Sequence, residues 1–285
     1  MIKSKHTPVL LNLILQQAGE VKEKKVIDAT AGEGGCTAAL LQAGAKVLAV
    51  DIDPKQIMKL KKNLKEYITE KKLYPVSGNF SNLGNIAKKY GFYPADIIIF
   101  DLGLSWHQIA ESARGFSFKA EEEPLDMRFN RRFKYTAADL LNSLPDNQLY
   151  DIFASFAQEP YSREITQEIT RIRKLKKFKK VKDLAEVIKK IAPASRYESS
   201  ARRIFQALRI AVNNEMANLK KGLNQAVNIL AENGKILCLT FHPTEDRVVK
   251  NLAREKNLKI TLFKSKNPKG NFEKIAKLRV LQLKA

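Results

Sequence analysis

Residues 26–36 read Val-Ile-Asp-Ala-Thr-Ala-Gly-Glu-Gly-Gly-Cys, a short apolar run that leads into a glycine-rich turn. A helical stretch follows, and then a second apolar run, residues 47–50, ends on Asp51. A strand, a glycine turn and a second strand with an acidic end form the layout of a nucleotide-type cofactor site in an open α/β sheet. Asp51 is placed to accept hydrogen bonds from ribose hydroxyls.

The charge of this turn indicates which cofactor it suits. Asp28 and Glu33 put two carboxylates where the pyrophosphate of a dinucleotide would have to meet the N–H groups at the start of a helix. S-adenosylmethionine has no phosphate and carries a positively charged sulfur, so it fits an acidic turn better. The sequence therefore predicts a methyl-donor site.

Short apolar runs recur along the chain and separate helical or loop stretches, a pattern typical of a parallel sheet flanked by helices. The predicted strands are Val26–Asp28, Val47–Asp51, Tyr74–Val76, Ile97–Asp101, Lys235–Phe241, Leu258–Phe263 and Lys277–Leu283. Between the fourth and fifth strands the sequence is helical and charged. Helical patterns cover residues 54–73, 140–156 and 201–230, and a bend is expected at Gly222. We predict a Rossmann-like methyltransferase domain, residues 1–110 and 200–285, which is interrupted by a helical domain, residues 111–199.

The composition of the 285 residues points to a polyanionic partner. There are 51 Lys and Arg against 30 Asp and Glu, a formal net charge of +21, which favours nucleic acid. A lysine-rich proteome is the plainer explanation. Cys36 and Cys238 lie far apart and form neither a disulfide pattern nor a metal-ligand spacing, so no metal is expected. Without a signal peptide or an apolar run that could span a bilayer, the expected compartment is the cytoplasm and no membrane is expected as a partner.

The fourth predicted strand ends on Asp101. Ligands of open α/β sheets bind beyond the carboxyl ends of the strands, so we expect Asp101 to face both the methyl group and the substrate. A carboxylate there can hold an amine while its nitrogen attacks the methyl group. Alternatively, Asp101 caps the next turn or contacts only the cofactor.

Three stretches are candidates for RNA contact. Residues 114–119, Arg-Gly-Phe-Ser-Phe-Lys, combine aromatic rings with cations, which suits a splayed base and its phosphate; a hydrophobic loop anchor is the alternative. Residues 171–182 concentrate Arg and Lys, either for phosphate contact or as a solvated face. His242 follows the fifth strand at the ligand edge, where a histidine is more often structural.

Together these features resemble the bacterial small-subunit rRNA (cytosine-N4)-methyltransferase family, also called RsmH or MraW. The matching stretches, in order along nearly the whole chain, begin at His6 (His-Thr-Pro-Val-Leu-Leu), Asp28 (Asp-Ala-Thr-Ala-Gly-Glu-Gly-Gly), Asp51 (Asp-Ile-Asp-Pro), Gly78 (Gly-Asn-Phe-Ser), Asp101 (Asp-Leu-Gly-Leu-Ser), Arg114 (Arg-Gly-Phe-Ser-Phe), Pro124 (Pro-Leu-Asp-Met-Arg), Thr136 (Thr-Ala-Ala-Asp), Phe205 (Phe-Gln-Ala-Leu-Arg-Ile-Ala-Val-Asn), Glu245 (Glu-Asp-Arg) and Ala276 (Ala-Lys-Leu-Arg-Val). The chain departs from the family pattern at Glu33, Cys36, Trp106 and His107.

The resemblance implies methyl transfer from S-adenosylmethionine to N4 of a decoding-centre cytidine in 16S rRNA of the small ribosomal subunit, with the inserted helical domain recognising RNA. The implied cofactor contacts are Gly34, Gly35, Cys36, Asp51, Phe80, Asp101 and Gln108, with Asp101 also the candidate catalytic residue. The RNA contacts expected from the candidate stretches and the matching motifs are Arg114, Phe116, Phe118, Arg128, His242 and Arg247.

Two other functions remain open on the sequence alone. A ribosome-assembly factor could keep this fold with an inactive site, and the departures at Cys36, Trp106 and His107 favour that reading. A nicotinamide-dependent dehydrogenase would use a similar sheet, but the acidic turn and the missing third glycine argue against it.

Overall fold

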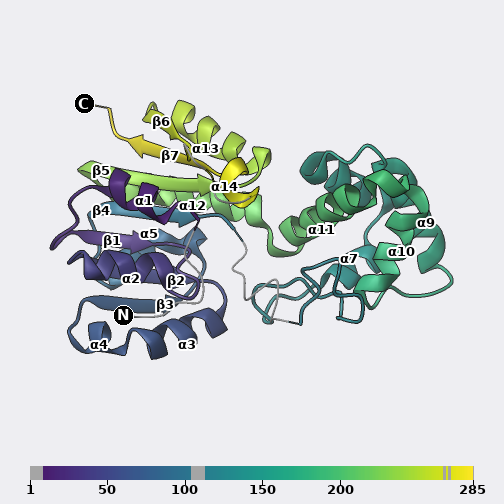
Figure 1. Cartoon of the computed structure of the whole chain (residues 1–285), viewed down its shortest axis with the longest axis horizontal. Helices are drawn as coiled ribbons and strands as arrows, with labels where there is room; N and C mark the ends of the chain where they lie inside the picture. Colours follow the sequence, from purple (N-terminus) through teal and green to yellow (C-terminus); the bar gives the residue numbers. More distant parts are fainter. Residues whose placement is uncertain (1–8, 104–112, 266–267, 269–270, 285) are drawn as a thin grey trace. The chain divides into compact units, whose positions relative to one another are not determined.

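The computed structural model of the protein describes residues 9–103, 113–265, 268 and 271–284; Gln108, a predicted cofactor contact, lies outside them. The chain divides into two compact units (Figure 1). The sheet unit comprises Met1–Gly103 and Met216–Ala285, and the helical unit comprises Leu104–Glu215. Among the described residues, every helix is too short or too polar to cross a bilayer.

The sheet unit is built on seven strands in the order β3-β2-β1-β4-β5-β7-β6. Their bounds are β1 Lys25–Asp28, β2 Lys46–Asp51, β3 Leu73–Ser77, β4 Ala95–Asp101, β5 Leu230–Thr240, β6 Lys259–Phe263 and β7 Lys277–Gln282. Strands β1 to β5 are parallel to one another, while β7 runs antiparallel to both β5 and β6. Each of the seven predicted strands is present, and the predicted fold class is confirmed.

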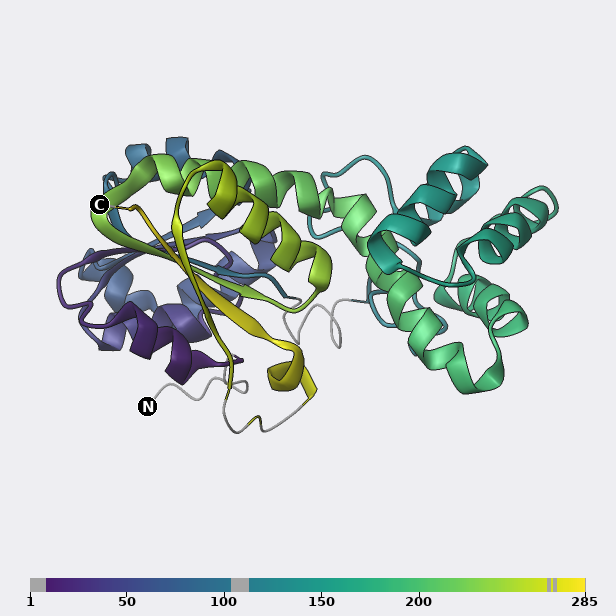
Figure 2. The ribbon, with the colours of Figure 1, turned by 90° about the horizontal axis from the view of Figure 1, so that it is seen from above.

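Helices cover both faces of this sheet (Figure 2). One face packs against α1 (Leu11–Ala18), α2 (Gly35–Gln42) and α3 (Pro54–Asn63), and the other against α5 (Leu83–Lys89), α12 (Glu215–Ile229) and α13 (Pro243–Glu255). The short helices α4 (Lys65–Thr69) and α14 (Asn271–Ile275) complete the described α-helices of this unit. Central strands buried on both faces explain the nearly continuous apolar runs in the sequence.

The helical unit has its own apolar core. Its helices are α7 Ala137–Ser143, α8 Asp146–Ile152, the π-helix η2 Phe153–Ala157, α9 Ser162–Arg173, α10 Val181–Ile191, the 3₁₀ helix η3 Ala194–Arg196 and α11 Tyr197–Asn213. The predicted return to the sheet domain at residue 200 differs from the observed division, which falls after Glu215. The reason is that the apolar side of α11, including Ile204 and Leu208, belongs to the helical core.

Three predicted long helices are interrupted. The stretch 54–73 breaks at Leu64, and the stretch 140–156 breaks at Pro145, because proline cannot continue the preceding helix. The stretch 201–230 breaks at Asn214, whose φ of 49° lies in the left-handed region. A bend was expected at Gly222 instead, but that glycine lies inside α12, where it has a packing role.

Candidate active site

Three aspartates lie at the carboxyl ends of neighbouring strands. Asp28 ends β1, which pairs with β2 and β4, whose last residues are Asp51 and Asp101. The carboxyl ends of parallel strands meet at one edge of a sheet, so these three carboxylates form a single acidic cluster. The topology thus brings together two predicted site residues and the acidic residue that opens the glycine turn.

Backbone N–H groups of the turn hold Asp51 in place. Its Oδ2 accepts from Gly32 N–H at 2.8 Å, and its Oδ1 accepts from Asp53 N–H at 2.8 Å. Gly34 precedes α2 with a φ of 91°, a conformation that residues with a Cβ rarely adopt. The glycine turn and the end of β2 are therefore one hydrogen-bonded structure.

Burial raises the pKa of all three carboxyl groups above the ordinary value of 3.8. The pKa of Asp28 rises to about 6 and that of Asp51 to about 6, with hydrogen bonds to each opposing the effect of burial. The pKa of Asp101 rises to about 7, because burial is reinforced by repulsion from Asp28. Ionised carboxylates are energetically unfavourable in this site, and a bound positive charge would stabilise them. The site therefore favours a ligand with positive charge. This electrostatic character fits S-adenosylmethionine.

Asp101 has its backbone fixed and its carboxylate available. Its N–H donates to Thr30 Oγ1 at 2.7 Å, which ties the end of β4 to the glycine turn. Among the described residues, no hydrogen bond reaches its side-chain oxygens, whereas Asp28 accepts from Thr37 Oγ1 at 2.7 Å. Asp101 therefore keeps its acceptor capacity for a ligand.

Phe80 follows β3 in a short 3₁₀ turn, η1 (Phe80–Asn82), and its ring stands edge-on to Phe100 at 5.6 Å. Helix α12 packs directly behind this turn. A Cβ on Gly222 would lie 2.6 Å from Phe80 Cδ2, so only glycine leaves room for the ring. Gln225 holds both sides of the turn: its Oε1 accepts from Gly84 N–H at 2.6 Å, and its Nε2 donates to the Ser81 carbonyl at 2.8 Å.

Gly222 and Gln225 were not predicted as site residues. They lie more than 140 positions from the turn that they support, and neither belongs to a recognisable motif. The only signal was an unexplained glycine inside a helical pattern, which often marks close packing.

Two departures from the family pattern have local explanations. The carboxylate of Glu33 forms an ion pair with Lys59 of α3 at 3.1 Å, so the extra acid in the turn is balanced. Cys36 is buried in α2, and burial raises the pKa of its thiol well above the ordinary range. Its thiol therefore stays protonated at neutral pH and acts as a small apolar group.

His242 caps the N-terminus of α13. Its Nδ1 accepts from Thr244 N–H at 3.2 Å, and Glu245 Oε2 accepts from the N–H groups of His242 and Phe241 at 3.1 and 2.9 Å. With Nδ1 as an acceptor, the neutral ring carries its proton on Nε2. The capping contacts agree with the structural alternative for this histidine, while Arg247 on the same helix is exposed.

The predicted RNA contacts of the helical unit have internal partners. Arg114 is buried and donates through Nη1 to the carbonyls of Arg128 and Phe129 at 2.9 and 2.8 Å. Phe116, 8% exposed, stacks on Phe129. Arg128 itself pairs with Asp126 at 2.7 Å. These contacts agree with the hydrophobic-anchor alternative.

Phe118 differs from this group because it is only half-buried, with its ring edge-on to Tyr197 and Phe205.

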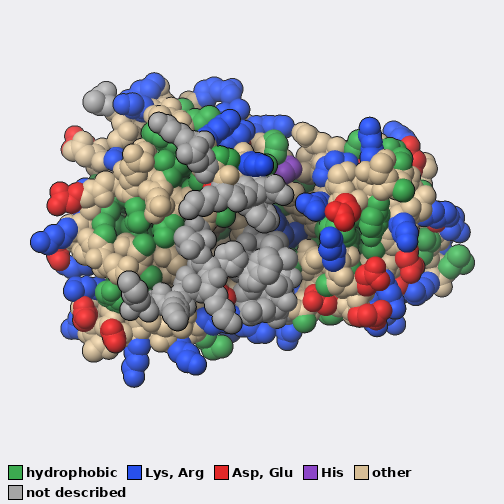
Figure 3. Space-filling view, viewed as in Figure 1, with side chains coloured by type: hydrophobic (Ala, Val, Ile, Leu, Met, Phe, Trp, Pro, Cys, Tyr) green, Lys and Arg blue, Asp and Glu red, His purple; other side chains and the backbone are tan. Residues whose placement is uncertain are grey.

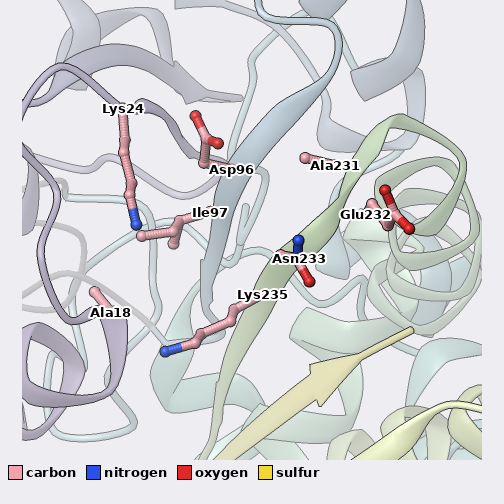
Figure 4. Close-up of a pocket in the computed structure, with 8 residues that line it drawn as sticks. All are labelled: Ala18, Lys24, Asp96, Ile97, Ala231, Glu232, Asn233 and Lys235. Atoms are coloured by element: carbon pink, nitrogen blue, oxygen red, sulfur yellow. The ribbon is translucent and has the colours of Figure 1, made fainter. Parts of the chain in front are cut away.

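A hollow of about 300 Å³ lies away from the acidic cluster, at the edge where the parallel strands begin (Figure 4). Two of its charged side chains have partners within the fold. Asp96 Oδ2 accepts from Lys25 N–H at 2.8 Å, and Lys235 Nζ donates to the Gln17 carbonyl at 2.9 Å. We therefore place the candidate site at the carboxyl edge.

The strand order with its reversed β7, and the acidic cluster beyond β1, β2 and β4, define an α/β protein of the S-adenosylmethionine-dependent methyltransferase class. A profile of the MraW methylase family matches residues 3–284. The chain belongs to the MraW methylase family.

Curated relatives are similar over most of their length. The ribosomal RNA small subunit methyltransferase H of Dictyoglomus thermophilum is 38% identical, over 98% of this chain and 97% of the relative. The protein of the same name from Thermomicrobium roseum is 39% identical, over 89% of this chain and 78% of the relative. A solved rRNA methylase from Streptococcus thermophilus is 12% identical, over 94% of this chain and 92% of that one, with a TM-score of 0.44. The fold assignment rests on the strand order and not on this last likeness.

Proposed function

We propose that this protein transfers the methyl group of S-adenosylmethionine to N4 of a cytidine in 16S rRNA, within the small ribosomal subunit and in the cytoplasm. The observation that carries the proposal is the carboxylate of Asp101, which is held at the end of β4 beside Asp28 and receives no hydrogen bond from the described residues. The names of the curated relatives support rRNA of the small subunit as the substrate.

S-adenosylmethionine supplies a methyl group on a positively charged sulfur. Asp101 accepts a hydrogen bond from the N4 amine of the cytosine and orients its nitrogen for in-line attack. The N–C bond forms as the C–S bond breaks, and the methylated nitrogen then loses a proton. Asp101 takes that proton, since its pKa of about 7 suits a group that must ionise again near neutral pH.

The remaining residues divide between cofactor and RNA. Asp51 accepts from the ribose hydroxyls and Phe80 packs on the adenine. The turn residues Gly34, Gly35 and Cys36, together with Gln108, line the rest of the donor site. The helical unit recognises RNA, with Phe118 stacking on a base, and His242 and Arg247 contribute from α13. Arg114, Phe116 and Arg128 act indirectly, by holding residues 113–135 in shape.

An assembly factor without catalysis is the weaker alternative. A chain freed from catalysis has no reason to retain three carboxyl groups with raised pKa values at one edge of its sheet.

The proposal is tested in cells that lack this gene. Nucleosides from their 16S rRNA are compared by mass spectrometry with those from cells complemented by the wild-type gene. We expect N4-methylated cytidine to be absent from the mutant and restored by complementation. Identical methylcytidine content in both strains would contradict the proposed substrate.

Cofactor binding is expected to release protons at mildly acidic pH. Because their pKa values are raised in the folded protein, the three carboxyl groups stabilise the unliganded fold while they are protonated. This contribution to the free energy of unfolding is lost as the pH rises from about 4 through 7. A cationic ligand favours the ionised forms, so binding near pH 6 should expel on the order of one proton. Near pH 8.5 the groups are already ionised and the release should vanish. Calorimetry in buffers of different ionisation enthalpy measures this, and equal apparent enthalpies at pH 6 would contradict it.

Gln225→Ala is expected to weaken donor binding by about 5- to 20-fold, because two hydrogen bonds that fix the Phe80 turn are lost. At saturating donor, kcat should stay close to that of the wild type, since Gln225 does not touch the reacting atoms. Asn224→Ala is the matched control, because the Asn224 amide donates within its own helix to the Lys220 carbonyl. Equal donor affinity in the two variants would rule out this positioning role.

A further inference from the structure

The loop between α9 and α10, residues 174–180, presents an apolar side chain to solvent. Leu175 is 80% exposed, the highest value for a large apolar side chain in the described part of the chain. An isolated exposed leucine is ordinary on a protein surface. Leu175 differs from such a residue in two ways: hydrogen bonds anchor its loop, and lysines without ion pairs surround it.

The loop is rigidly anchored on both sides of its tip. Phe178 is buried at 2% exposure, and the Asn142 side chain binds both its N–H and its carbonyl, at 3.0 and 2.9 Å. The next carbonyl, that of Lys179, accepts from Leu125 N–H at 2.9 Å. On the other side, Leu175 N–H donates to the Ile172 carbonyl at 2.8 Å. Hydrogen bonds on both sides of Leu175 therefore fix the position of its backbone.

Most cations around this loop form ion pairs with acids of the same unit. The ion pairs are Arg171 and Lys190 with Glu168, Arg173 with Asp146, Lys176 with Asp183, and Lys180 and Lys182 with Glu122. Figure 3 shows acidic side chains beside many Lys and Arg side chains on the helical unit. The basic run 171–182 is therefore largely an internal ion-pair network.

Three lysines of the loop differ. Lys174, Lys177 and Lys179 are exposed, and none of them forms an ion pair within the described residues. Each can neutralise an RNA phosphate and so release a cation from the counterion atmosphere of the RNA. The loop that carries Leu175 therefore presents three lysines without an acidic partner among the described residues.

We propose that this loop is an RNA-docking surface, in which Lys174, Lys177 and Lys179 contact phosphates and Leu175 packs against the face of an unpaired nucleotide. A single-stranded or looped RNA segment offers both features, a regular row of negative charges and exposed apolar base faces. The inference rests on the proposed function, since it assumes that the substrate is RNA. It adds which residues of the helical unit meet that substrate away from the reacting base.

The test compares two triple variants with equal loss of charge. One replaces the unpaired lysines (Lys174→Gln, Lys177→Gln, Lys179→Gln), and the matched control replaces paired ones (Lys176→Gln, Lys180→Gln, Lys182→Gln). Binding to small subunits that lack the methyl group, and to naked 16S rRNA, is measured over a range of salt concentrations. The slope of log K against log salt is negative, and each lost phosphate contact lowers its magnitude by about 0.7 to 0.9. We expect the first triple to lower this magnitude by about 2 and the control to lower it by less than about 1.

Leu175→Ser is expected to weaken binding to both RNA samples by about 3- to 10-fold with an unchanged salt slope, because it removes an apolar contact and no charge. Thermal melting of each variant establishes that the unit is folded.

Equal slopes for the two triple variants would overturn the proposal. A loss of binding to subunits but not to naked rRNA would also overturn it, since the partner would then be a ribosomal protein. If the proposed function is wrong but the docking surface is right, the wild-type protein would bind RNA with the expected salt dependence and transfer no methyl group.

Discussion

Asp101→Asn is expected to lower kcat for methyl transfer by about 10²- to 10⁴-fold, the range for loss of a positioned proton acceptor. Asparagine has nearly the same shape and can still accept a hydrogen bond from an amine, but it has no charge and cannot take the proton. The measurement is single-turnover methyl transfer at saturating donor and saturating small subunits. Donor affinity should change far less than kcat, because the contacts of Asp51 and Phe80 are untouched.

A stability measurement separates this effect from damage to the fold. Burial raises the pKa of Asp101 to about 7, so ionising it costs stability above that pH. The Asn variant avoids this cost, and its melting temperature above pH 7 should match or exceed that of the wild type. Turnover within a few-fold of the wild type, in a variant with this stability profile, would remove Asp101 from the mechanism.

Asp51→Ala is expected to raise the Kd for S-adenosylmethionine by about 100-fold. Hydrogen bonds to a charged group contribute about 1.5–3 kcal/mol each, and a tenfold change in affinity corresponds to about 1.4 kcal/mol. The variant also releases the N–H groups of Gly32 and Asp53, which loosens the glycine turn. Equilibrium titration of the donor measures the change, and kcat should recover when the donor is saturating.

Asp53→Asn is the matched control for Asp51→Ala. Asp53 caps α3 by accepting from Lys55 N–H at 3.0 Å, and asparagine is an equally good capping residue. Its donor affinity should stay within a few-fold of the wild type. If Asp51→Ala and Asp53→Asn bind the donor equally well, the ribose contact is not at Asp51.

The sheet was predictable because each strand is marked by a short pattern within its own stretch of sequence. Each parallel strand of the core is an apolar run, and those that matter for the site end on an aspartate, so strand ends and candidate ligands were marked together. The helix interruptions at Leu64 and Asn214 were missed because no proline or glycine stands at either position. Local backbone conformation there depends on packing that the sequence does not display.

Part of the site was beyond sequence reasoning for a related reason. Gln225 supports the Phe80 turn across 144 positions, and Lys180 meets Glu122 across 58. Contacts of that separation are set by the tertiary fold. As a result, the basic run 171–182 looked like one uniform surface, whereas the structure leaves only three of its lysines without an ion pair among the described residues.

The central claim is that this protein methylates N4 of a cytidine in small-subunit rRNA. The most direct measurement incubates the purified protein with labelled S-adenosylmethionine and small subunits that lack the modification, followed by nucleoside analysis of the rRNA. The account predicts label in N4-methylated cytidine with the wild-type protein and almost none with Asp101→Asn. Label in another nucleoside, or no label although the donor binds, would contradict it.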